Sequence, residues 1–254
     1  MEYNRTLLQM GFVAGKASTC VFYHPDLDVR LVVHGDDFVL SGQEKHLHYF
    51  ADQLKQKYLV KIRGVLGPDQ NDQKAITLLN RVVEWTEDGL QIEADPRHVE
   101  LVLRDLGLQY AKGSSVAGTV IEEDDLTMPL TEVETTRYRS VVARCNYLAA
   151  DRPDIQFAVK ELCREMSTPT TTSMSKLKKL GRYLQRHPRL LIYFSYQHTP
   201  CNLGIYADAD YAGCRRTRRS TNGGCTMLGE HCIKHGPVRS LSSPYPLGKR
   251  SITD

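Results

Sequence analysis

Two adjacent carboxylates, Asp36 and Asp37, stand between short runs rich in Val, Leu and Phe at residues 31–33 and 38–40. Two β-rich runs separated by a short turn predict a β-hairpin with the carboxylates at its tip. Metal-dependent phosphoryl transfer uses carboxylates that converge on cations roughly 3.5–4 Å apart, and a tight turn holds such side chains without a flexible linker. The pair therefore indicates nucleotidyl transfer. The alternative is a simple polar turn, because Gly and Asp are favoured there for backbone reasons alone.

The composition indicates a globular chain with nearly balanced charge. Of its 254 residues, 41% are hydrophobic, and 33 Lys and Arg face 30 Asp and Glu, for a formal net charge of +3. This length suits one large domain or two smaller ones. The net charge neither requires nor excludes a polyanionic partner, so local clusters of basic residues must decide.

The cysteines and the hydrophobic runs indicate an intracellular protein that contacts no membrane. The seven cysteines are scattered and include no C-x-x-C pair, which favours free thiols in a reducing compartment. A zinc site built from Cys225, His231, Cys232 and His235 is disfavoured, because the spacing matches no standard finger. No apolar run approaches the length of a bilayer span, and the first residues lack the organisation of a secretory signal. The choice between cytoplasm and nucleus stays open.

Hydrophobic periodicity predicts an α+β chain. A strand at 20–23, the acidic hairpin and a helix at 43–57 resemble a βαβ-like module, and a further helix follows the N-cap Asp95 and ends at Gly107. Residues 111–128 predict a surface linker. The remaining predicted elements are strands at 75–79, 81–85, 90–94, 203–208, 223–228 and 231–234, and helices at 135–148, 152–166 and 174–185.

Two basic clusters are candidates for contact with a phosphate backbone. The helix at 174–185 and the residue after it supply Lys176, Lys178, Lys179, Arg182 and Arg186, and a loop at 215–219 contains Arg218 and Arg219. Basic side chains along one helix face can follow a nucleic-acid backbone. An ordinary solvated helix face explains the pattern about as well.

Several segments, in the same order along the chain, together resemble a known family. They are Gly11-Phe12 with CVFY at 20–23, the Asp-Asp hairpin, DGLQIEADPRHVELVLRDLGL, YRSVVARCNYLAADRPDIQFAV and LGIYADADYAGCRRTRRSTNGG. In combination they resemble the C-terminal part of the reverse transcriptase of copia-type retrotransposons, continuing into the RNase H domain.

The resemblance implies a partial reverse-transcriptase palm with a helical thumb and connection, followed by a truncated ribonuclease-H-like mixed sheet. The expected parts are a partial palm and start of the thumb at 1–112, a linker at 113–134, a helical connection at 135–198, the truncated RNase H-like domain at 199–235, and a disordered tail at 236–254. The implied partners are an RNA template, an RNA/DNA hybrid and deoxynucleotides. The oligomeric state is left open.

The resemblance also implies roles for individual residues. Asp36 and Asp37 correspond to the two polymerase aspartates that bind Mg²⁺, or alternatively Mn²⁺, although His34 and Gly35 replace the Tyr and Val of the family's tetrad. Asp208 corresponds to the first catalytic and metal-binding carboxylate of RNase H. Asp210 would lie on the same strand face, but a solvent-facing strand residue explains it better. Lys61 lies where the family often has a lysine near the incoming nucleotide's phosphates.

The same resemblance predicts that this chain alone is inactive. Related polymerases use a third aspartate on an earlier strand that this sequence does not contain. After His235 the residues depart abruptly from the family. Our hypothesis is a one-nucleotide shift of reading frame, which would explain the tail and the absence of the RNase H glutamate. The alternatives to a polymerase and RNase H fragment are a non-catalytic nucleic-acid-binding module and a non-functional pseudogene product.

Overall fold

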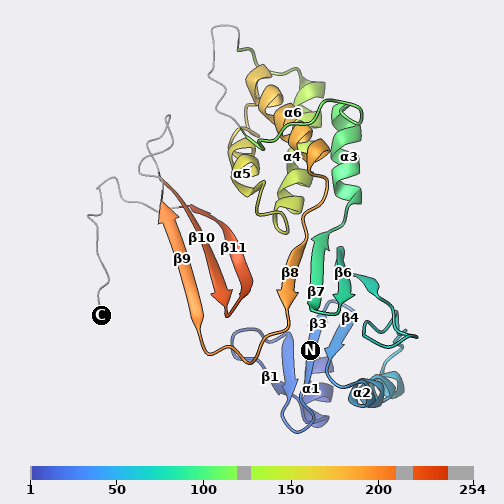
Figure 1. The fold of residues 1–254 in the computed structure, drawn as a ribbon. Coiled ribbons are helices and arrows are strands. Elements are labelled where there is room, and N and C mark those ends of the chain that lie inside the picture. The colour runs from blue at the N-terminus through green and yellow to red at the C-terminus, as the bar shows by residue number, and fades with distance from the viewer. Residues whose placement is uncertain (1, 119–126, 210–219, 240–254) are drawn as a thin grey trace, which may run out of the picture. The chain divides into compact units, whose positions relative to one another are not determined.

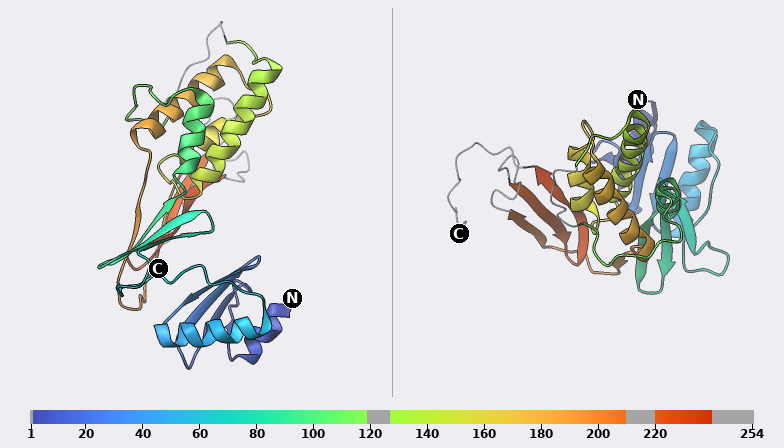
Figure 2. Two further views of the ribbon diagram at one scale, coloured as in Figure 1. Left: turned by 90° about the vertical axis from the view of Figure 1, so that its right-hand side faces the viewer. Right: turned by 90° about the horizontal axis from the view of Figure 1, so that it is seen from above.

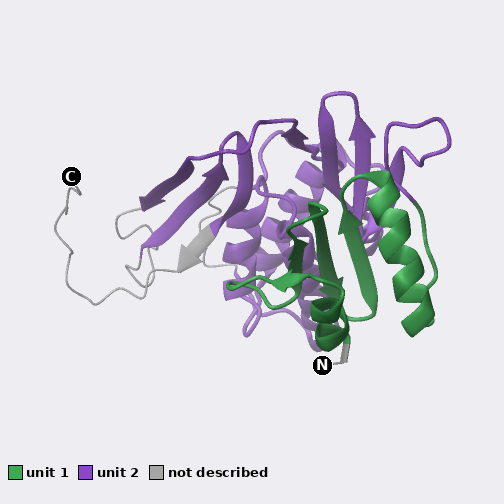
Figure 3. Cartoon of the chain, turned by 90° about the horizontal axis from the view of Figure 1, so that it is seen from below, with its two compact units in different colours: residues 1–64 green, residues 65–254 purple. Residues whose placement is uncertain are grey.

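The structure of the chain, a computed structural model, describes residues 2–118, 127–209 and 220–239. Within these ranges it is a mixed α+β protein with six helices and three antiparallel sheets (Figure 1, Figure 2). The α+β class predicted from the sequence is therefore confirmed. The chain divides into two compact units, Met1–Gly64 and Val65–Asp254 (Figure 3).

The first unit contains one four-stranded sheet and two helices. Its elements are α1 (Glu2–Gln9), β1 (Val13–Ala14), β2 (Val21–His24), β3 (Val29–His34), β4 (Asp37–Ser41) and α2 (Glu44–Lys57). The strands pair antiparallel in the order β1-β2-β3-β4. The expected βαβ-like module is wrong, because each strand returns beside its predecessor through a short turn and α2 leads to no parallel strand in this unit.

Strict alternation in β3 creates the core of the first unit. Val29, Leu31 and Val33 are buried, whereas the intervening side chains are exposed. Successive strand residues face opposite sides of a sheet, so these three form an apolar face. The helix α2 packs Phe50 and Leu54 into the same core, and Figure 2 shows it lying along one face of the sheet.

Among the residues that the structure describes, the second unit begins with strands, continues with four helices and ends with strands. Its elements are β5 (Ala75–Leu78), β6 (Arg81–Thr86), β7 (Gly89–Ala94), α3 (Arg97–Leu106), α4 (Glu132–Ala149), α5 (Gln156–Arg164), α6 (Thr171–Arg186) and β8 (Ile192–Ser195), followed by β9 (Leu203–Ala209), β10 (Thr221–Leu228) and β11 (His231–Arg239). One sheet has the order β5-β6-β7-β8 and the other has the order β11-β10-β9.

The four helices of the second unit share one apolar core. It includes Val102 of α3, Val142 of α4, Val159 of α5 and Leu180 of α6, all at most 1% exposed. The two ends of α3 follow the predicted signals. Asp95 accepts a hydrogen bond from the backbone N–H of Arg97 at 2.9 Å, and Gly107 ends α3 in the left-handed conformation with φ 67°.

The three-stranded sheet is tied to the rest of its unit at two places. Gln156 and Lys160 of α5 hydrogen-bond His235 and Thr221. At the other end of the sheet, Gln197 contacts His231 at 2.9 Å. These side-chain bonds place the opening turns of α5 beside β10 and β11.

Several expectations fall on residues outside the described ranges. They concern Asp210, the basic loop at 215–219 with Arg218 and Arg219, and the tail from residue 240 onward. Among the described helices, none has the length and apolar character needed to cross a bilayer.

Candidate functional site

The tip of the β3–β4 hairpin presents the two adjacent carboxylates. His34 and Asp37 are cross-strand partners, so Gly35 and Asp36 form a two-residue turn. Gly35 has φ 59°, and a glycine with positive φ at the first turn position is typical of the hairpin turns that match strand twist. Asp36 is exposed, and Asp37, the first residue of β4, is half-buried. The predicted hairpin is confirmed.

An arginine that sequence reasoning did not single out neutralises one of these carboxylates. Arg63 Nη2 lies 3.2 Å from Asp37 Oδ1. Arg63 belongs to the irregular segment after α2, which also holds Lys61, whose side chain is exposed. The ion pair brings this segment to the hairpin tip. No local pattern could have shown the contact, because the partners are 26 positions apart and meet only after α2 folds.

The hairpin offers oxygen ligands that suit a hard cation, but it supplies only two carboxylates. Mg²⁺ prefers oxygen ligands, keeps several waters and commonly takes one or two protein carboxylates together with substrate phosphates. Asp36 and Asp37 supply ligands of this kind. In the part of the chain that the structure describes, no three His, Cys, Asp or Glu side chains lie close enough together to hold a metal ion.

The basic helix α6 presents only part of its predicted stripe to solvent. Lys176 is half-buried and pairs with Glu165 at 2.6 Å. Lys179 is also half-buried, whereas Lys178, Arg182 and Arg186 are exposed. A spacing of four residues places these three on one helix face, which we call the basic face. The structure thus divides the predicted set into three exposed residues and two half-buried lysines, of which Lys176 pairs with Glu165.

Asp208 lies in a different setting from the hairpin aspartates. Its side chain is exposed on β9, directly opposite Gly223 of β10. It lines an open groove of about 390 Å³ between the start of α5 and the three-stranded sheet. Sequence reasoning missed the other lining residues, including Gln156, Phe157 and His235, because the start of α5 is more than 50 positions from the strands that complete the groove.

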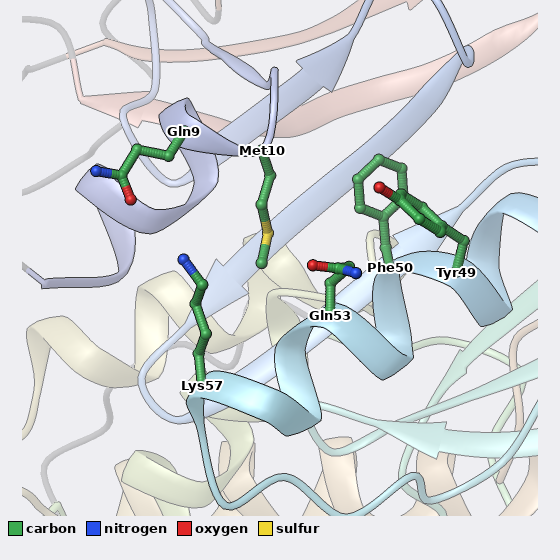
Figure 4. A pocket seen from close by; sticks show the side chains of 6 residues that line it. All are labelled: Gln9, Met10, Tyr49, Phe50, Gln53 and Lys57. Atoms are coloured by element: carbon green, nitrogen blue, oxygen red, sulfur yellow. The ribbon is translucent and has the colours of Figure 1, made fainter.

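A smaller hollow lies in the first unit between the end of α1 and α2. It measures about 230 Å³ and is lined by Gln9, Met10, Tyr49, Phe50, Gln53 and Lys57 (Figure 4). Its lining contains one cation and no carboxylate. It therefore offers no ligands for a divalent metal.

Comparison with known proteins places the chain in a family. It is 32% identical over 227 residues to an uncharacterised mitochondrial protein of Arabidopsis thaliana. This match covers 84% of this chain and 86% of that protein. It is 29% identical over 249 residues to the retrovirus-related Pol polyprotein from transposon RE1 of the same plant, and 29% identical over 251 residues to that from transposon RE2. Each of these matches covers 94% of this chain but only 16% of the Pol polyprotein.

The two transposon relatives are retrovirus-related proteins of mobile elements. The chain belongs to the family of Pol polyproteins from copia-type transposons, as the resemblance of its motifs indicated. No protein-family model matches the chain. No solved structure matches it.

Proposed function

We propose that the chain is a fragment of an RNA-directed DNA polymerase whose hairpin carboxylates, Asp36 and Asp37, bind Mg²⁺ in the intact parent protein. The observation that carries this proposal is the two-residue turn, which holds both carboxylates at one hairpin tip. In this reading the first unit is part of a palm, and the helices of the second unit belong to the thumb and connection. The family relationship supports nucleic acid as the partner, with an RNA template, an RNA/DNA hybrid and deoxynucleotides as the specific ligands.

The roles of the chain's residues follow from their positions. A bound Mg²⁺ would stabilise negative charge as a primer 3′ hydroxyl attacks the α-phosphate of a nucleotide. Asp36 and Asp37 would hold the cation through carboxylate oxygens. Arg63 pairs with Asp37 and would give up this contact if the carboxylate held a cation. Lys61, exposed in the same segment, would contact the nucleotide's phosphates.

We propose further that neither polymerisation nor RNA cleavage proceeds on this chain alone. Two-metal catalysis needs carboxylates that clamp both the attacking and the leaving oxygen. The described residues supply two at the hairpin and leave Asp208 without a neighbouring acidic cluster. In this proposal Asp208 would serve RNase H chemistry only beside carboxylates from elsewhere in the parent.

Two measurements test the hairpin site. Mn²⁺ added to labelled protein should broaden the amide signals of residues 35–38 first, and Asp36→Asn with Asp37→Asn should abolish that broadening. Equal broadening in the double variant would refute metal binding at the hairpin. Primer extension on a poly-ribonucleotide template should be absent from both proteins. Extension by the original chain, lost in the double variant, would contradict the expected inactivity.

A second candidate function is metal-independent binding of nucleic acid through the basic face of α6. Its three cations are exposed and evenly spaced, which is the observation that favours it. Each phosphate contact contributes about 0.9 to the slope of log K against log salt for duplex DNA. Changing Lys178, Arg182 and Arg186 to Ala should therefore lower that slope by about 2–3 and weaken binding similarly for all sequences.

The matched control for this experiment changes three exposed lysines of the other unit, Lys16, Lys45 and Lys57, to Ala. It removes the same number of positive charges and should leave the slope nearly unchanged. Equal loss of binding in the control and in the triple variant would show a general effect of net charge and would exclude the basic face as the interface.

A further inference from the structure

The groove beside Asp208 includes a position without a side chain, Gly223. Gly223 lies opposite Asp208 on one side and Pro237 on the other. Directly opposed strand residues project to the same face of a sheet, so Gly223 adjoins the Asp208 carboxylate. A Cβ added at Gly223 would meet no atom within 4 Å. The missing side chain therefore leaves open space next to a carboxylate.

An exposed aromatic ring forms part of the opposite wall. Phe157, near the start of α5, lines the groove and is 57% exposed. The ammonium of Lys160 lies 5.5 Å from the centre of its ring and also bonds the Thr221 hydroxyl, which joins α5 to β10. An aromatic ring exposed at the wall of a polar groove is a surface on which a flat heterocycle can stack.

The hydrogen bonds of His235 define which of its nitrogens is a donor. The side-chain amide of Gln156 faces the carbonyl oxygen of Ala149 at 2.8 Å, so the atom there must be the NH₂ group. The same NH₂ group lies 2.9 Å from His235 Nδ1. In the neutral ring, Nδ1 then accepts and Nε2 carries the proton. The groove thus combines a ring face, a carboxylate acceptor and an imidazole N–H donor.

We propose that this groove binds a guanine base of single-stranded nucleic acid. An ionised carboxylate only accepts hydrogen bonds, so a base that pairs with both oxygens of Asp208 must present two neighbouring donors. Among the four bases of RNA, only guanine presents two adjacent donors, N1–H and the N2 amino group, on its Watson–Crick edge, next to the acceptor O6 that suits the His235 N–H. Proteins read unpaired bases by stacking on aromatic side chains and by hydrogen bonds to this edge. The groove volume of about 390 Å³ lies within the range of small-ligand sites.

The test uses the full chain and four mononucleotides in the presence of EDTA, with binding followed by calorimetry or NMR. GMP should bind at least tenfold more tightly than AMP, CMP or UMP. Asp208→Asn and Phe157→Leu should each weaken GMP binding about tenfold. Gly223→Val should abolish GMP binding, because the added side chain fills the open space next to Asp208. The backbone at this position is not left-handed, so valine can be accommodated without strain. Circular dichroism checks that each variant is folded.

Two controls separate this site from other binding. Tyr110→Leu removes a fully exposed aromatic ring elsewhere in the second unit and should leave GMP affinity unchanged. The Asp36→Asn and Asp37→Asn double variant should also bind GMP normally, so this inference can fail or succeed independently of the proposed metal site. Equal affinity for all four nucleotides, binding that requires Mg²⁺, or unchanged GMP affinity in both Gly223→Val and Phe157→Leu would overturn it.

Discussion

A buried arginine shows how single residues hold the helical part of the second unit together. Arg152 is 1% exposed, and its guanidinium donates to both oxygens of Asp154 at 2.9 and 2.7 Å. It also donates to the carbonyls of His187 and Pro188, directly after α6. Tyr183 of α6 adds a hydrogen bond to Asp154 at 3.0 Å. These contacts join the connection between α4 and α5 to the end of α6.

The Asp154 carboxylate should make stability depend on pH in the acid range. Burial alone would raise its pKa, but hydrogen bonds and charge from Arg152, with the Tyr183 hydroxyl, outweigh burial and hold the pKa below its ordinary value. A lowered folded-state pKa gives stability that is present above the unfolded value of about 3.9 and is lost as pH falls through the folded value. Melting temperature should therefore fall between about pH 5 and pH 2 in part through this group.

Substitution at Asp154 tests this dependence. Asp154→Ala should lower the free energy of unfolding at pH 7 by about 3 kcal/mol, because it leaves the Arg152 charge buried without its partner. Asp154→Asn should flatten the acid limb of the curve of melting temperature against pH. Asp88→Asn, at an exposed turn, is the matched control and should retain the original curve. An unchanged acid limb in Asp154→Asn would contradict the assignment.

At the scale of elements, a glycine in α6 allows this helix to approach Leu106, the last residue of α3, and Leu108, two positions further on. A Cβ at Gly181 would lie 2.6 Å from Leu108 Cδ1 and 2.9 Å from Leu106 Cδ1. Gly181 is itself buried within α6. The absent side chain therefore permits a close helix contact in the core, which offsets the low helix propensity of glycine.

Gly181→Val should destabilise the second unit by about 1–3 kcal/mol, because the added methyl groups must displace both leucine side chains from a packed core. The matched control is Lys178→Val, an exposed position in the same helix, where only the lower helix propensity of valine acts and the cost is about 0.5 kcal/mol. Denaturant unfolding of both variants measures the difference. Equal midpoints would show that the core has room for the side chain.

Elements with local signals could be predicted from the sequence, and those with distant partners could not. Residues that are close in sequence carry the signals for three of these features. They are the alternation in β3, the cap at Asp95, and the apolar faces of α4 and α6. The strand β8 was not predicted, because its apolar run is short and it forms a strand by pairing with β7, where Phe194 lies opposite Leu90. The same distinction applies to the two candidate sites. The hairpin carboxylates are adjacent in sequence and could be predicted, whereas the groove near Asp208 lies between α5 and three strands and could not.

At the scale of the whole molecule, the residues that the structure describes form two separate hydrophobic cores. One belongs to the unit Met1–Gly64 and is built around Phe22, Leu31 and Phe50. The other belongs to Val65–Asp254 and is built from the four helices. No residue is shared between the two clusters. Damage to one core should therefore act mainly on the unit that contains it.

Hydrogen exchange measured on the full chain tests this separation. Phe50→Ala removes a side chain that is 1% exposed and should cost the first unit about 3–5 kcal/mol. Protection of amides in β2, β3, β4 and α2 should fall, while amides in α4 and α6 should exchange at their original rates. Leu180→Ala, which removes a side chain fully buried in the helical core, should produce the reverse pattern. Loss of protection throughout the chain in both variants would mean that the two units unfold as one, and the hairpin carboxylates would then depend on the helical core for their position.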